Sequence, residues 1–220
     1  MNDIETISRQ LESSNSKDRM LALASLRQVP AETAVPLIKK VLNDEMLTVR
    51  SMAVFALGVK QTDECFPILV ELLETDEDYG IRADAAGALG YLEDIRAFEP
   101  LSRAFYEDTA WLVRFSAAVS LGNLRDIRAK QVLSNALDSG ETVIQQAAIA
   151  ALGEIRAIEA VEKLLTFVSS EDWLTRLRLA QALGNLKTDK SIAALKFLAK
   201  DDNAQVREAA IHSLQRSESA

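Results

Sequence analysis

Few residues of this chain could act as nucleophiles or metal ligands. It has one cysteine, Cys65, and one histidine, His212, and neither has a second histidine or cysteine near it in the sequence. Catalytic Cys–His or Ser–His pairs and His-rich metal sites need such groups close together. We therefore predict no metal site and assign no catalytic residue. We expect Cys65 to be a small buried hydrophobe and His212 to be an ordinary helix residue.

Large aromatic residues in a helical run are more informative. The run "DTAWLVRFSAAVSLGNL" (108–124) places Trp111, Phe115 and Val119 four residues apart, and this spacing puts them on one face of a helix. That face lies off the stripe of alanine and leucine that the helix needs for its own packing. An apolar surface of this kind is typical of a site for a protein partner or a flat ligand.

This run belongs to an internal repeat. Five ten-residue blocks align, namely "VRSMAVFALG" (49–58), "IRADAAGALG" (81–90), "VRFSAAVSLG" (113–122), "IQQAAIAALG" (144–153) and "TRLRLAQALG" (175–184). Weaker copies, "DRMLALASLR" (18–27) and "VREAAIHSLQ" (206–215), flank them. A period of about 31 residues accounts for essentially the whole chain.

Each repeat is predicted to contain two helices. The aligned block is the second helix, with apolar residues at its first, fifth and ninth positions. A glycine (Gly58, Gly90, Gly122, Gly153 or Gly184) is expected to end it as a cap with positive φ. The predicted fold is all-α, an α-solenoid superhelix of seven HEAT-like two-helix repeats in a single domain, 1–220. The repeats span roughly 1–30, 31–61, 62–93, 94–125, 126–156, 157–187 and 188–220.

The composition narrows the class of partner. The formal net charge is −8, so a nucleic-acid partner is not expected. No apolar run approaches the ~20 residues that span a bilayer, and the start "MNDIETISRQ" lacks the apolar core of a signal peptide. A single cysteine excludes an internal disulfide. We therefore expect a cytoplasmic protein without an integral membrane segment.

The repeat alignment extends the aromatic face to other repeats. Tyr79, Trp111 and Trp173 hold one position, three residues before the repeat arginine. The second helices are expected to line the inner curve of the solenoid, with arginines beside the rings to pair with carboxylates. The predicted groove for a ligand or partner consists of Phe55, Tyr79, Arg82, Trp111, Arg114, Phe115, Val119, Trp173, Leu177 and Arg178. The alternative is that the tryptophans only fill gaps between neighbouring repeats.

The repeat arginines also have a structural interpretation. An aspartate precedes the arginine by six residues in several repeats, as in Asp44/Arg50, Asp76/Arg82 and Asp108/Arg114. Because the two recur at one register, they are expected to form a ladder of charge-assisted hydrogen bonds between successive turns.

Two runs, "AWLVRFSAAVSLGNL" (110–124) and "SSEDWLTRLRLAQALGNL" (169–186), carry a more specific resemblance. The chain resembles the short HEAT-like repeat proteins of the phycobilisome-lyase type. Within them it is similar to the cyanobacterial non-bleaching phycobilisome degradation proteins (NblB type), which are related to the E/F-type phycobilin lyases. The Tyr-Asn-Tyr-Gly-type run of the attaching lyase subunits is missing, and "DEDYGIRADA" (76–85) stands in its place.

The resemblance implies phycobiliprotein subunits and an open-chain tetrapyrrole (a bilin such as phycocyanobilin) as partners, and no required cofactor. It favours help in detaching or handling bilin over attaching it. Whether the chain is an enzyme stays open, because a lyase-like activity would lack a recognisable acid–base set. The competing hypothesis is a non-catalytic scaffold or assembly factor that binds protein and no pigment.

Overall fold

The computed structural model describes residues 3–218, and within this range the chain is helical, with no β-strand. The packing divides it into two compact units, the first ending at Ser120 and the second beginning at Leu121. The first unit contains α1 (Ile4–Leu11), α2 (Ser16–Ser25), η1 (Leu26–Gln28), α3 (Ala31–Lys39), α4 (Leu47–Lys60), α5 (Cys65–Thr75), α6 (Tyr79–Leu92), η2 (Ile95–Ala97), α7 (Phe98–Glu107) and most of α8 (Trp111–Asn123). The second contains α9 (Ala129–Ala136), α10 (Thr142–Glu154), η3 (Ile158–Ala160), α11 (Val161–Leu164), η4 (Leu165–Phe167), α12 (Trp173–Leu186), α13 (Asp189–Leu198) and α14 (Ala204–Glu218).

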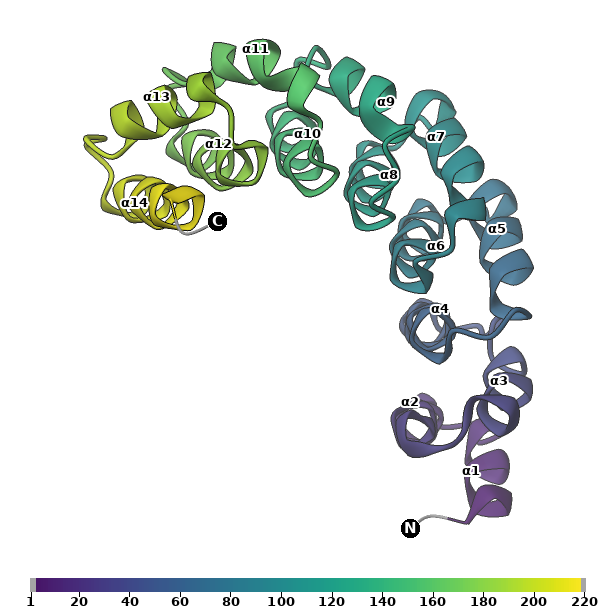
Figure 1. Cartoon of the computed structure of the whole chain (residues 1–220). Helices are drawn as coiled ribbons and strands as arrows, with labels where there is room; N and C mark the ends of the chain where they lie inside the picture. The colour runs from purple at the N-terminus through teal and green to yellow at the C-terminus, as the bar shows by residue number, and fades with distance from the viewer. Residues whose placement is uncertain (1–2, 219–220) are drawn as a thin grey trace. The chain divides into compact units, whose positions relative to one another are not determined.

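Within each unit the helices alternate between two layers (Figure 1). The even-numbered helices are the predicted second helices, and neighbours among them pack directly, as α4 does on α6 and α12 does on α10 and α14. The odd-numbered helices form the other layer. This arrangement confirms the predicted α-solenoid fold class of two-helix repeats. The single-domain prediction for 1–220 stays a prediction.

The core is the stripe that the periodicity predicts. The first, fifth and ninth positions of the central blocks are fully buried, at Val49, Ala53, Leu57, Ile81, Ala85, Leu89, Val113, Ala117, Leu121, Ile144, Ala148 and Leu152. Each large side chain buried in this way stabilises the fold by about 1.5–3 kcal/mol. Because the stripe faces the neighbouring repeats, residues on the opposite side of each second helix remain available for other contacts.

The repeat glycines do not cap their helices, which corrects the sequence-based expectation. All five lie inside the second helices, without positive φ, and each helix continues beyond its glycine. The left-handed residue comes three positions later, at Gln61, Glu93, Arg125, Arg156 and Lys187. Among the described residues, Gly140 is the one glycine with positive φ, and it lies in a turn between α9 and α10.

Close packing explains the glycines instead. A Cβ atom added to Gly122 would lie 2.6 Å from the Cβ of Ala151, and one added to Gly153 would lie 2.6 Å from the Cα of Ala182. These distances are far below van der Waals contact, so a side chain at either position would push neighbouring second helices apart. Glycine therefore sets the spacing of the second-helix layer.

No described helix combines the length and the apolar character that crossing a membrane requires.

Candidate functional site

The repeat arginines form a ladder that joins successive repeats. Arg82 donates from Nε and Nη2 to the two carboxylate oxygens of Asp108, at 2.7 and 3.1 Å, and from Nη1 to the carbonyl of Asp76 at 2.9 Å. Arg176 pairs with Asp201 in the same way, at 2.7 and 2.9 Å. The aspartate thus comes from the following repeat, whereas the residue six positions before the arginine contributes its backbone carbonyl.

The ladder keeps its carboxylates charged. The hydrogen bond from Arg176 is the main cause that holds the pKa of Asp201 below its usual value, against the opposing effect of burial. For Asp108, burial is the largest single effect and acts to raise the pKa. Hydrogen bonds from Arg82 and from the backbone N–H of Ala110 outweigh it, so the pKa of Asp108 is also lowered. These pairs are structural, with side chains that are mostly buried.

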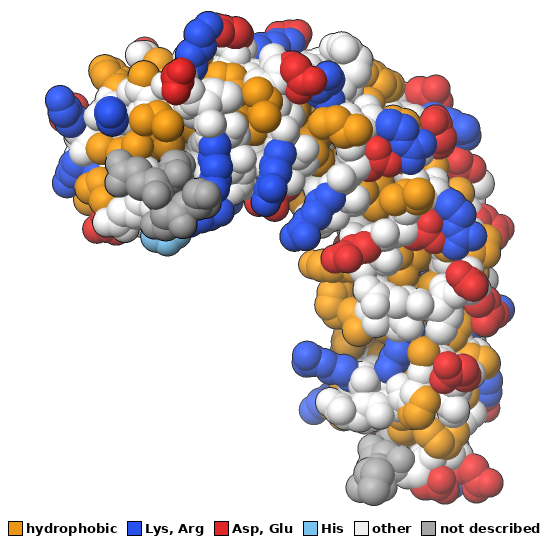
Figure 2. Space-filling view, viewed as in Figure 1, with side chains coloured by type: hydrophobic (Ala, Val, Ile, Leu, Met, Phe, Trp, Pro, Cys, Tyr) orange, Lys and Arg blue, Asp and Glu red, His pale blue; other side chains and the backbone are white. Residues whose placement is uncertain are grey.

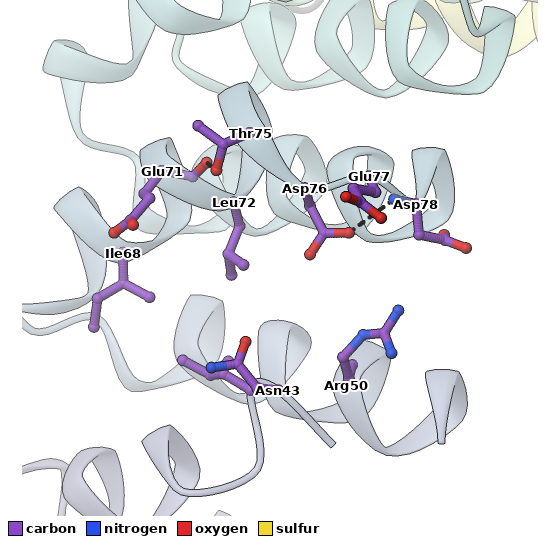
Figure 3. Close-up of a pocket in the computed structure, with 10 residues that line it drawn as sticks. Asn43, Arg50, Ile68, Glu71, Leu72, Thr75, Asp76, Glu77 and Asp78 are labelled. Carbon is purple, nitrogen blue, oxygen red and sulfur yellow. Dashed lines mark hydrogen bonds between the residues drawn. The ribbon is translucent and has the colours of Figure 1, made fainter. Parts of the chain in front are cut away.

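The rung of this ladder between repeats two and three is open, although both its arginine and its aspartate are present (Figure 3). Arg50 donates from Nη1 to the carbonyl of Asp44 at 3.0 Å, as its counterparts do. Among the described residues no ion pair joins Arg50 to Asp76, whose Oδ1 accepts instead from the backbone N–H of Asp78 at 2.9 Å. A cleft of about 720 Å³ lies between them, lined also by Leu72. Repeats two and three are therefore joined without the ion pair that ties repeats three and four.

The ladder corrects the place of Arg82 in the predicted groove. Its four hydrogen bonds to Asp108, Asp76 and Glu77 use four of the five N–H donors that a guanidinium has. Arg82 is therefore committed to holding two repeats together rather than to binding a ligand. Arg114 also donates to backbone carbonyls, those of Asp108 at 3.3 Å and Thr109 at 3.4 Å.

The predicted aromatic residues of the first unit lie wholly or partly at the surface. Trp111 is the first residue of α8 and is 52% exposed, and its ring lies 6.5 Å from that of Phe115, edge to face. Val119, one turn further on, is exposed as well. The rings of Trp111 and Phe115 thus lie next to each other, as their helical spacing predicts, and about half of the surface of Trp111 remains accessible. We call Trp111, Phe115 and Val119 the α8 aromatic face.

Tyr79 and Phe55 are exposed too, but on other helices. Tyr79 begins α6 and Phe55 lies in the middle of α4, and both have more than half of their surface accessible. The ring of Phe55 packs edge-on against Tyr91, with 6.0 Å between the centroids. Phe55 therefore has its own aromatic neighbour, and it lines a separate cavity that is described below.

In the second unit, three predicted residues share one cavity. Trp173, Leu177 and Arg178 line a space of about 750 Å³ between α10, α12 and α14. Arg178 is exposed and donates to Oε1 of Gln181 at 3.3 Å. His212 lines the same cavity, although its isolation in the sequence had set it aside. The signal that could have found it is its block position, which Phe55 and Val119 share. We call this cavity the Trp173 pocket.

The sequence missed a second cavity, which lies in the first unit. It measures about 670 Å³ and is bordered by α2, α4 and α6, with Phe55 and Asp84 among the lining residues.

In the residue range that the structure describes, no group of three or more histidine, cysteine or acidic residues is placed to hold a metal ion. Cys65 is fully buried, as predicted, with the hydroxyl of Thr62 3.2 Å from its sulfur.

The face drawn in Figure 2 carries mixed charges, with acidic and basic side chains interspersed among apolar ones.

Stacked helix pairs, a buried apolar stripe and a ladder of arginine–aspartate pairs define an α-solenoid of the HEAT class. The family model for HEAT repeats matches residues 4–90, 66–153 and 131–215, so the chain belongs to the HEAT-repeat family. No curated protein matches the chain at a significant level.

Solved structures share this fold at low sequence identity. A chain of the complex of CpcE and CpcF of phycocyanin lyase from Nostoc sp. PCC7120 is 21% identical, with a TM-score of 0.64, and the match covers 100% of this chain and 95% of that one. The Escherichia coli protein YibA is 19% identical with a TM-score of 0.61, covering 98% and 93%. An engineered protein is 24% identical with a TM-score of 0.60, covering 100% and 69%.

Proposed function

We propose that this chain is a cytoplasmic cyanobacterial protein of the NblB type that binds phycobiliprotein and open-chain tetrapyrrole and assists the detachment or handling of bilin. The observation that carries the proposal is the set of exposed aromatic residues on the second helices. Trp111 and Tyr79 are about half exposed, and Trp173 lines a cavity beside Arg178. The likeness of fold to a subunit of phycocyanin lyase over the whole chain supports the same class of partner.

The chemistry of a bilin suits these surfaces. A bilin is a long conjugated molecule that carries two propionates, so it favours aromatic side chains for its rings and arginines for its carboxylates. The Trp173 pocket offers an indole and the exposed guanidinium of Arg178 in a space of about 750 Å³. That volume lies within the range of about 300–1,000 Å³ that is usual for sites that bind small molecules.

Assistance with detachment does not require a nucleophile from this chain. Cys65 is fully buried and its sulfur lies next to a hydroxyl, so it is not positioned to attack a ligand at the surface. A protein that binds free bilin more tightly than the attached form shifts the equilibrium toward release by differential affinity alone. Any lyase-like activity would rest on such binding, with no catalytic residue assigned.

The direct test uses purified protein and pigment. Adding the protein to free phycocyanobilin is expected to change the visible absorption of the pigment, because binding fixes the conformation of the flexible tetrapyrrole. The same titration is run with phycocyanin to detect binding of the attached chromophore. A spectrum that is unchanged in both cases, at protein concentrations of tens of micromolar, would contradict the proposal.

The second candidate function is a protein-binding scaffold without pigment. The α8 aromatic face favours it, because exposed tryptophan is a common anchor of protein interfaces and this face is not enclosed in a cavity. Fold alone does not name a partner. Co-elution with phycocyanin in size-exclusion chromatography, together with an unchanged phycocyanobilin spectrum, would favour the scaffold over the bilin-handling protein.

A further inference from the structure

The cavity bordered by α2, α4 and α6 has an apolar floor with polar groups at two ends. Leu23, Met52, Phe55 and Val59 contribute to its floor, and Arg27 and Asp84 are among its polar residues. No residue of α3 or α5 in the described range lines it, so it opens on the side of the second helices that faces away from the first helices. We call it the α4 pocket.

The first block of the repeat lacks the glycine, and this opens the pocket. In the next block, a Cβ added to Gly58 would lie 2.9 Å from the Cα of Ala88, and α4 packs extensively on α6. Arg27 holds the glycine position in the first block, and Ala56 of α4 corresponds to Ala88. Both line the pocket. Because an arginine side chain takes the place of the glycine, α2 packs less extensively on α4 than α4 does on α6.

Asp84 forms the acidic end of the pocket. Its Oδ2 accepts a hydrogen bond from the hydroxyl of Ser51, and its side chain is half-buried. Burial is the main cause that raises the pKa of Asp84, with the Ser51 bond opposing it and the negative charge of Asp78 adding to it. Within residues 3–218, no lysine or arginine pairs with this carboxyl group. A cation at this end of the pocket would therefore stabilise the charged form of Asp84.

Arg27 forms the basic end. Its side chain is exposed, and no carboxylate of the described residues pairs with its guanidinium. Lys60 is nearby but already used, because its ammonium donates to the backbone carbonyls of Val29 at 2.6 Å and Arg27 at 3.1 Å. These bonds fix the end of α4 against the loop after η1. The guanidinium of Arg27 is therefore available to an anionic group.

The length of α4 separates the two ends. Ser51, which contacts Asp84, lies near the start of α4, whereas Lys60, which contacts the backbone of Arg27, is its last residue. Nine residues of α-helix rise by about 13 Å. The ring of Phe55 lies midway, with 55% of its surface exposed. An occupant that uses both ends needs an apolar middle, a cation at the Asp84 end and an anion at the Arg27 end.

A helix meets these requirements better than an extended peptide does. The floor consists of apolar side chains, so it offers no hydrogen bonds to the backbone of an extended segment. An α-helix satisfies its own N–H and C=O groups and presents only side chains to the floor. Two turns rise by about 11 Å, and residues three, four and seven positions apart share one face. One face of a short amphipathic helix therefore spans the pocket from end to end.

We propose that the α4 pocket binds an amphipathic helix of a partner protein, antiparallel to α4, with an acidic residue in its first turn at Arg27 and a basic residue two turns later at Asp84. The charges set the direction, because an acid near the start of a helix and a base near its end also suit the helix dipole. Apolar side chains between them would pack on Phe55, as in other helix-in-groove complexes. This inference is independent of bilin handling, which concerns the Trp173 pocket.

The test measures binding of a designed, fluorescein-labelled peptide to the whole protein by fluorescence anisotropy. The probe is an alanine-based helix of about 15 residues, with glutamate in the first turn, lysine two turns later and leucines between them on the same face. Wild-type protein is expected to bind it saturably. Phe55→Ala should weaken binding by about tenfold, as loss of an aromatic anchor does.

A double-mutant cycle across the interface tests the pairing and the direction. Asp84→Asn, or glutamine in place of the lysine of the peptide, should weaken binding by about threefold to fivefold, and both changes together should cost no more than one. Arg27→Gln and glutamine in place of the glutamate should behave in the same way. The crossed combinations, such as Asp84→Asn with the peptide that lacks glutamate, should give additive losses.

Matched controls lie elsewhere on the surface. Phe197→Ala removes an exposed phenylalanine of α13, and Arg125→Gln replaces an exposed arginine after α8, so both variants should bind the probe as wild type does. Helical circular dichroism and thermal melting establish that each variant is folded. Asp84→Asn is expected to melt at or above the wild-type temperature, because burial opposes the charge of Asp84.

Three results would overturn the inference. The first is the absence of saturable binding by the wild-type protein, and the second is a set of losses in which Asp84 does not couple to the lysine of the peptide. The third is a dimer of the wild-type protein that both Arg27→Gln and Phe55→Ala dissociate, because a second copy of the chain would then fill the pocket.

Discussion

Trp111 contributes less to folding than its size suggests. It is 52% exposed, and its main aromatic neighbour, Phe115, lies on the same helix one turn away. Only the buried part of a side chain adds to stability. We therefore predict that Trp111→Ala weakens binding of phycocyanin by about tenfold or more, as loss of an interface anchor does, while the melting temperature changes by only a few degrees.

A matched control lies on the other helix layer. Tyr106 on α7 is exposed to a similar extent, 54%, and it also packs edge-on against a phenylalanine, Phe105. Tyr106→Ala should leave phycocyanin binding unchanged if second helices form the binding surface. The prediction would be contradicted if the two variants lost equal affinity, or if Trp111→Ala unfolded. Either result would mean that Trp111 serves mainly to fill the space between repeats.

Individual side chains were predictable only where the helical period decides their place. The spacing of Trp111 and Phe115 put them on one exposed face, and the structure has them there. Arg82 was assigned to the groove, although its guanidinium binds Asp108 of the next repeat. The sequence of one helix does not predict how far away the next repeat lies, so this pairing could not be foreseen. Asp84 was missed although it holds the block position of Arg178, where the charge is reversed.

At the scale of helices, the repeat glycines control how closely neighbours approach. We predict that Gly122→Ala destabilises the protein by about 1–3 kcal/mol, the usual cost of overpacking, although alanine is the better helix former. The cause is the added Cβ, which would meet Ala151 at 2.6 Å. Urea unfolding measures the loss. Gly87→Ala, where nothing lies within 4 Å of the added atom, is the control and should be neutral or stabilising.

The ladder and its open rung make a matched pair for a double-mutant cycle. Arg82 and Asp108 share two hydrogen bonds, so the cycle of Arg82→Met and Asp108→Asn should give a coupling energy of about 1–3 kcal/mol. The cycle of Arg50→Met and Asp76→Asn should give a value near zero. A coupling of similar size in the second cycle would mean that this rung closes in solution.

The ends of the second helices could not be predicted from the repeat glycines. A glycine at the end of an apolar run is the usual sign of a helix cap, and five repeats gave the same signal. The helices instead continue for one or two residues beyond the glycine, and Gln61, Glu93 and their equivalents take the left-handed conformation. Only the approach of Ala88 to Gly58, from a neighbouring repeat, reveals what the glycine is for.

For the whole molecule, the ladder predicts how stability depends on pH. Asp44, Asp108 and Asp201 have lowered pKa values in the fold, so they bind protons less readily there than in the unfolded chain. Their stabilising effect is complete above the unfolded pKa of aspartate, about 3.9, and is lost as the pH falls through the folded values. The free energy of unfolding should therefore drop steeply below about pH 4.

Urea unfolding between pH 7 and pH 3 checks this dependence. Asp201→Asn, which removes one titrating partner, should be less stable than wild type at pH 7 and should lose less stability on acidification. Identical slopes for the two proteins would show that the Arg176–Asp201 pair does not contribute to acid sensitivity.

The fold as a whole was the most predictable level. A period of about 31 residues repeats the same buried stripe, and each repeat can bury that stripe only against its neighbours, so the period alone determines a stack of helix pairs. The function is harder to predict from the sequence than the fold, because stacks of helix pairs bind many different partners. The cavities that distinguish this chain arise where side chains from three neighbouring second helices meet, as at the Trp173 pocket.

The most direct test of bilin binding uses the two tryptophans as reporters. Trp111→Phe leaves Trp173, which lines the Trp173 pocket, as the single indole. Titration of this variant with phycocyanobilin should quench the tryptophan fluorescence to a plateau at one pigment per chain, because bilin bound in that pocket accepts energy from the indole that lines it. Quenching that rises linearly with pigment and never saturates, as for free tryptophan in solution, would contradict the account.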